Sequence, residues 1–119
     1  MEVSAEVVQT LNIRAKRRDT FELNVSVTDS DGADFDFTTH TALMHVRDAA
    51  SEDGTLLVTL TTADSSITLT DGTIALLKSA AGMDVEAGEY FYDLQITYPD
   101  GSVKTWLEGG FTVTDDVTV

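Results

Sequence analysis

The chain has no cysteine, a single proline, and no apolar run that approaches the roughly 20 residues of a membrane helix. Without disulfides, stability must come from a packed core, and such a composition suits a reducing cytoplasm without excluding later export. A chain of 119 residues is expected to form one domain, 1–119, with enough buried surface to need no covalent staples. The segment Met1–Glu6 is acidic and is followed by no apolar stretch, which argues against a signal peptide.

Basic residues are also scarce: 7 stand against 21 acidic ones, for a net charge of −14. Nucleic acids and anionic membranes would repel such a surface, so we expect neither as a partner. Four of the seven cations lie within five positions, at Arg14, Lys16, Arg17 and Arg18. A charge cluster of this kind is either a solvated turn or a docking patch for an acidic partner.

The residues that usually carry catalysis or bind metals are few. With no cysteine and only His40 and His45, the sequence shows no nucleophile paired with a base, and it lacks the three or four ligands of a zinc site. We therefore expect no enzyme activity and no cofactor. An EF-hand loop that begins at Asp29 would need glycine at Asp34 and glutamate at His40, so that motif fails, although another kind of calcium site stays open.

What the chain does contain is a repeated alternation of apolar and polar residues. The run Phe21–Thr28 places four apolar side chains on one face and four polar ones on the other, as a half-buried strand does. Similar runs recur, separated by turn sequences such as Asp71–Gly72 and Pro99–Gly101. Short strands with turns every eight to twelve residues predict an all-β protein, an antiparallel sandwich of seven to nine strands.

The same pattern sets the expected details of this sandwich. A loose N-terminal arm (1–6) precedes it, an exposed tail (114–119) follows it, and at most one short helix lies near 77–86. The glycine pair Gly109–Gly110 suggests a bulge or bend in the last strand. By alternation, the core should contain Leu23, Val25, Met44, Val58, Tyr92, Leu94 and Phe111.

Two large aromatic residues fall on the face opposite the core. Strict alternation sends Phe91 and Trp106 away from Tyr92 and Leu107, on neighbouring strands of the last hairpin. An exposed pair of this kind would mark a contact surface or a stacking platform for sugars. Cover by a loop or helix of the same domain is the favoured interpretation, because most large aromatic side chains are largely buried.

The order of these segments resembles the N-terminal immunoglobulin-like domain of the baseplate upper protein family, a group of tailed-phage virion proteins. The resemblance covers about residues 14–118 and is carried by Arg18–Phe21 with Asp29–Gly32, by Asp36–Thr38 with Thr41–Arg47, and by Ala87–Leu94 with Asp100–Gly101 and Leu107–Val113. The family often has glycine where this chain has Arg18 and Thr39, so the turn geometry at these two positions is in question.

The resemblance implies an immunoglobulin-like sandwich and a structural role in the virion. The chain would be an adaptor or decoration subunit of baseplate, tail, neck or capsid, made in the host cytoplasm and assembled in several symmetric copies on other virion proteins. We expect the N-terminal arm and the four clustered cations to dock on an acidic surface of a neighbouring protein, with Phe91 and Trp106 as further contact residues. The alternative is a carbohydrate- or receptor-binding module on the same fold.

Overall fold

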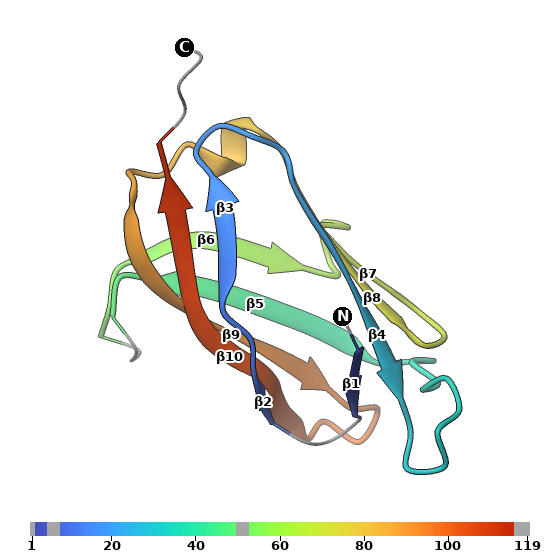
Figure 1. Cartoon of the computed structure of the whole chain (residues 1–119). Coiled ribbons are helices and arrows are strands. Elements are labelled where there is room, and N and C mark those ends of the chain that lie inside the picture. Colours follow the sequence, from blue (N-terminus) through green and yellow to red (C-terminus); the bar gives the residue numbers. More distant parts are fainter. Residues whose placement is uncertain (1, 5–7, 50–52, 116–119) are drawn as a thin grey trace.

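The computed structural model describes residues 2–4, 8–49 and 53–115, and for residues 2–4 it describes the backbone alone. The chain forms an immunoglobulin-like sandwich of two β-sheets (Figure 1). The four-stranded sheet has the order β1 (Glu2–Ser4), β4 (Phe21–Thr28), β8 (Thr73–Lys78), β7 (Ile67–Thr70). The larger sheet has the order β2 (Gln9–Thr10), β10 (Val103–Thr114), β9 (Gly88–Thr97), β5 (Thr41–Arg47), β6 (Leu56–Thr61), and β3 (Ile13–Lys16) also pairs with β10. Because β2 and β3 follow one another along β10, they count as one interrupted strand, and the sandwich has the number of strands that was predicted.

The three N-terminal strands β1, β2 and β3 are divided between the two sheets, and their pairings are parallel. Strand β1 pairs with the end of β4, whereas β2 and β3 pair with β10. The other pairings between strands are antiparallel, as expected. The prediction of a loose arm over 1–6 is therefore wrong for Glu2–Ser4, because the edge of β4 opposite to β8 offers free backbone groups to this segment. Of the predicted tail, Thr114 is the last residue of β10, Asp115 is exposed, and 116–119 lie outside the described residues.

The core lies between the two sheets and follows the predicted period of two. Six of the seven predicted core residues are buried: Val25, Met44, Val58, Tyr92, Leu94 and Phe111. The seventh, Leu23, is only half-buried although its neighbours Phe21 and Val25 on the same face of β4 are buried. The face assignment of β4 is thus correct, and Leu23 lies where the cover over that face is incomplete.

The predicted helix near 77–86 is reduced to one 3-10 turn, Ala81–Met83. Leu77 and Lys78 belong to β8, because their backbone continues the ladder with Glu22 and Phe21 of β4. Strand pairing therefore takes the start of the segment, and the remainder is too short for an α-helix to form. The side chain of Met83 is fully buried and closes one end of the core.

The glycine pair of β10 does not form a bulge. It makes room for the link between β2 and β3. A Cβ at Gly109 would lie 2.5 Å from the backbone oxygen of Leu11. That oxygen accepts a hydrogen bond from the hydroxyl of Tyr92 at 2.7 Å, and the amide of Gly110 donates to Asn12 Oδ1 at 3.0 Å. Burial raises the pKa of Tyr92, so its hydroxyl keeps the proton that it donates. These contacts fix the link between β2 and β3 on the larger sheet.

Candidate partner-binding site

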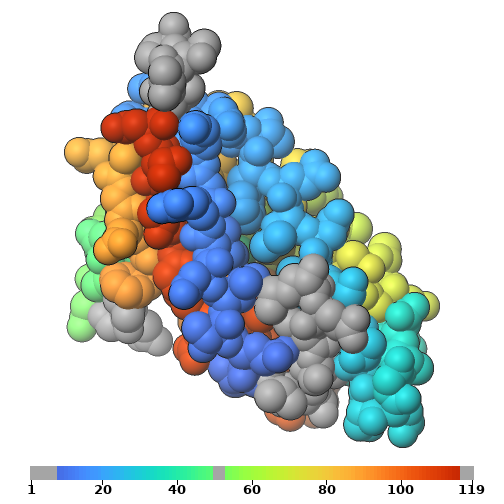
Figure 2. Space-filling view, in the orientation of Figure 1, coloured from blue at the N-terminus to red at the C-terminus, as the bar shows by residue number. Residues whose placement is uncertain are grey.

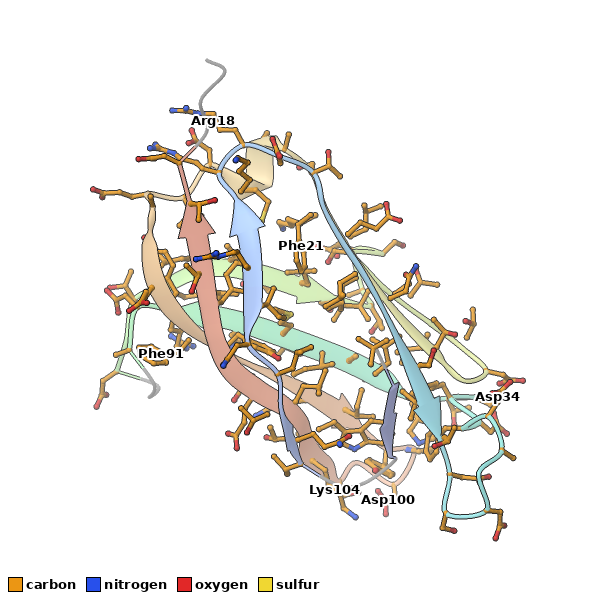
Figure 3. The ribbon with its side chains drawn as sticks, viewed as in Figure 1. Arg18, Phe21, Asp34, Phe91, Asp100 and Lys104 are labelled. Atoms are coloured by element: carbon orange, nitrogen blue, oxygen red, sulfur yellow. The ribbon has the colours of Figure 1, made fainter. Side chains whose placement is uncertain are left out.

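The four clustered cations divide into two pairs with different surroundings. Arg14 and Lys16 lie on the outer face of β3, where both are exposed and neither forms an ion pair with another described residue. Arg17 and Arg18 lie in the turn after β3, at one end of the molecule (Figure 3). Alternation along the sequence would send Arg14, Lys16 and Arg18 to one side as a single contact face, but β3 ends at Lys16 and Arg18 lies in the turn that follows.

The second pair of cations holds the loop around the 3-10 turn. The Nε atom of Arg17 lies 2.8 Å from Asp84 Oδ1, and the Nε atom of Arg18 lies 3.3 Å from the same oxygen. The hydrogen bond from Arg17 lowers the pKa of Asp84 below its usual value, and Asp84 in turn raises the pKa of Arg17. The backbone amide of Arg18 also donates to the oxygen of Met83 at 3.0 Å. These two arginines therefore serve the fold of this chain and offer less to a partner.

The ion pair at Asp84 predicts a specific dependence of stability on pH. Since its pKa is lower in the folded state, the carboxylate contributes stability above the unfolded value of about 3.9, and this contribution is lost as pH falls through the lower folded pKa. We expect Asp84→Asn to lower the free energy of unfolding at neutral pH, and the difference from wild type to vanish in acid. Urea unfolding at a series of pH values measures it. Asp31→Asn, which removes an exposed charge from a turn, is the matched control, and a difference that persists unchanged in strong acid would contradict this origin.

A groove runs beside the first pair of cations, between β3 and β4. It has a volume of about 360 Å³ and is lined by residues of 11–16 and 19–23. The two strands diverge from the turn that joins them, and Phe21 points from β4 into the space between them (Figures 1 and 3). Figure 2 looks onto this side of the molecule, with β3 in blue and β4 in lighter blue. Apolar groups of the core and the two free cations are thus brought together at one opening of the sandwich.

The two aromatic residues predicted to share an outer face are separated by a β-bulge. The register between β9 and β10 shifts between Thr105 and Leu107, so Trp106 is an extra residue and turns inward. Its side chain is 1% exposed, whereas Phe91 is 41% exposed. The favoured expectation of cover is therefore correct for Trp106 and wrong for Phe91, and the two do not form a common exposed patch.

Trp106 belongs to an aromatic cluster at one end of the core. Its ring centroid lies 5.1 Å from that of Phe35 and 5.6 Å from that of Phe37, and its Nε1 donates to the hydroxyl of Tyr98 at 3.1 Å. The ring of His40 packs on Phe35 and Tyr98, with Nδ1 3.0 Å from the oxygen of Thr38. Two phenylalanines, Phe35 and Phe37, beside an acidic turn are the sequence signal for this cluster. Their contact with Trp106 of β10 was not predictable, because the bulge changes the face to which Trp106 points.

Phe91 borders a shallow hollow on the outer face of the larger sheet. Gly109 and Gly110 line this hollow, and Gly110 is the direct partner of Phe91 in the ladder. His45, Asp93 and Glu108 also line the hollow. Asp93 is the ladder partner of His45 on β5 and of Glu108 on β10. The carboxylates of Asp93 and Glu108 therefore stand on neighbouring strands. The hollow combines an aromatic ring with polar groups, which is an arrangement able to bind a polar ligand or a partner side chain.

Metal binding receives no positive indication from the described ranges, in which no three side chains of His, Cys, Asp or Glu are grouped to hold an ion. The carboxylate of Asp29 accepts hydrogen bonds from the amides of Asp31 and Ala33, and that of Asp36 accepts from Thr38. Asp29 and Asp36, from the acidic segment in which another kind of calcium site was left open, thus organise turns.

No family model and no curated protein matches the chain. The geometry of the site and the pattern of the sequence are therefore the basis for a functional proposal. Within the described residues there is also no helix with the length and apolar character needed to cross a membrane. The groove beside Arg14 and Lys16 and the hollow at Phe91 are the two candidate surfaces for binding a partner or a ligand.

Proposed function

We propose that this chain is a structural subunit of a tailed-phage virion and that it acts by binding neighbouring virion proteins. The observation that carries the proposal is the backbone conformation at Arg18 and Thr39, which both have a φ of 65°. These are the positions where the similar phage domains often have glycine, and a positive φ is the conformation that glycine adopts at low cost. The positive φ at these two positions is compatible with glycine in the similar domains, and this agreement supports the proposal.

The exposed cations of β3 indicate where the subunit would make its contact. Because the chain has 21 acidic residues, free subunits repel one another, which favours solubility before assembly. Arg14 and Lys16 are an exception of opposite sign on this surface, and they line a groove in which apolar and polar side chains are mixed. Complementary charge at such a place favours the encounter with an acidic partner and fixes its orientation. Other copies of the chain would then be arranged by the symmetry of the particle.

The proposal is tested on purified phage particles that carry this gene. Mass spectrometry should find the wild-type protein in the particles, and the double variant Arg14→Glu with Lys16→Glu should be reduced at least about tenfold, since opposed like charges cost several kcal/mol. The single variants Lys16→Glu and Lys104→Glu change the charge equally, and Lys104 lies at the opposite end of the molecule from Arg18 (Figure 3). We expect a loss for the first of these variants and none for the second.

Three results would count against this function or against its proposed contact. The absence of the protein from purified particles would remove the virion assignment. Binding to a glycan array that is lost in Phe91→Ala would favour the carbohydrate-binding alternative, because Phe91 is the exposed aromatic ring of the outer hollow. Normal occupancy of the double variant would mean that the cations of β3 are only a solvated strand edge.

A further inference from the structure

Strands β3 and β4 each have a free backbone edge toward the groove. Strand β3 pairs with β10 on one side, and β4 pairs with β8 on one side and with β1 only over Ser26–Thr28 on the other. The backbone hydrogen bond between Asp19 and Lys16 belongs to the turn, and no ladder joins β3 to β4 in the described structure. Unpaired strand edges are templates for the addition of another strand.

The apolar side chains along this opening are incompletely covered. On β4, Leu23 is half-buried between Phe21 and Val25, which are both buried. On the other side of the groove, Ala15 and Leu11 are half-buried, whereas Ile13 between them is buried. All of these side chains belong to the core or pack against it, so the sandwich is open along one side. A segment placed in the groove would remove further apolar surface from water.

The alternation of β3 defines what an added strand must look like. Ile13 and Ala15 face the interior, while Arg14 and Lys16 face outward. A strand paired with β3 would place apolar side chains opposite the first two and its intervening side chains opposite the two cations. Carboxylates at these intervening positions are favoured, and a second copy of β3 is disfavoured because its cations would stand against Arg14 and Lys16. On the side of β3 the charge pattern therefore favours an acidic strand of another protein, whereas Asp19 and Glu22 place two carboxylates at the turn and on the side of β4.

We infer that the groove between β3 and β4 is a strand-addition site for an extended segment of a neighbouring virion protein, one in which apolar and acidic residues alternate. The segment extends the larger sheet beyond β3, and its backbone supplies affinity while the alternate side chains supply specificity. Its apolar residues cover Leu23 and Leu11. This inference gives a binding mode to the contact in the proposed function, and it rests on that function only for the identity of the partner.

Two blocked octapeptides, one alternating valine and glutamate and the other alternating valine and lysine, test the inference. Each is titrated into the 15N-labelled full chain to about 2 mM, and the amide signals of Ile13–Lys16 and Phe21–Val25 are followed. We expect the glutamate peptide to bind at least about tenfold more tightly and to shift these signals. This preference runs against the net charge of −14, which by itself would attract the lysine peptide.

Variants of the full chain separate local recognition from general charge effects. Lys16→Glu should remove the preference for the glutamate peptide, and Arg14→Glu should weaken it independently, whereas Lys104→Glu should leave it unchanged. The inference is overturned if neither peptide binds, if both bind equally, or if the shifted signals lie outside the groove. The peptide assay uses no particles, so a negative result does not decide the virion assignment, which mass spectrometry tests. Conversely, absence of the protein from particles would not overturn a positive peptide result.

Discussion

Replacing Trp106 with alanine is expected to lower the free energy of unfolding by about 3–5 kcal/mol, the usual cost of removing a large buried aromatic side chain. The indole is 1% exposed and contacts Phe35 and Phe37. Its loss would also leave the hydroxyl of Tyr98 without the donor Nε1 of Trp106. Urea unfolding measures the change, with an unchanged m-value as the sign that only stability has altered.

Phe91→Ala is the matched control for this prediction. Phe91 is an aromatic residue of the same hairpin, but 41% of its surface is exposed, so its truncation should cost no more than about 1 kcal/mol. If the two variants lose the same free energy, the bulge does not turn Trp106 inward. Strict alternation of β9 and β10 places both side chains on the outer face and therefore predicts such equal losses.

Leu94→Ala is expected to cost about 2–5 kcal/mol, because it leaves a cavity at the centre of the core. Leu94 is fully buried on β9 and lies between Met44 of β5 and Leu107 of β10 in the register. Three strands of the larger sheet meet there, so the surroundings have little freedom to collapse into the space. Thermal or urea unfolding of the variant and wild type under the same conditions gives the difference.

Leu77→Ala provides the same chemical change at a surface. Leu77 is 48% exposed on β8, and its truncation should change the free energy of unfolding by about 0.5 kcal/mol or less. An equally small effect of Leu94→Ala would mean that the inner and outer faces of β9 have been exchanged, since a strand shifted by one residue turns each side chain to the other face.

The sandwich itself was predictable because a strand that covers a core leaves a period of two in the sequence. Val25 of β4, Met44 of β5 and Leu94 of β9 were assigned to the core from this period alone, and all three are buried. The turns were equally local signals, since Gly72 and Gly101 adopt the positive φ for which these sequences select glycine.

Features that depend on contacts distant in sequence were not predictable. The bulge at Trp106 changes the face of one residue without leaving a trace in the composition of β10. Arg17 and Arg18 form ion pairs with Asp84, which lies 67 residues after Arg17 in the sequence. The run of four cations could therefore not reveal that two of them are paired within this chain. The candidate site was therefore anticipated in its residues Arg14 and Lys16, and the groove beside them came only from the structure.

The parallel pairing of β2 and β3 with β10 has a consequence for the order of folding. Asn12 and Gly110 meet across 98 residues, so this edge of the larger sheet closes only after β10 has left the ribosome. Contacts of such long range form slowly, because the entropy of closing the loop must be overcome first. Until Val103–Thr114 have been synthesised, β3 thus has no partner in the larger sheet, so the edge that the proposed docking would use is among the last parts of the fold to form.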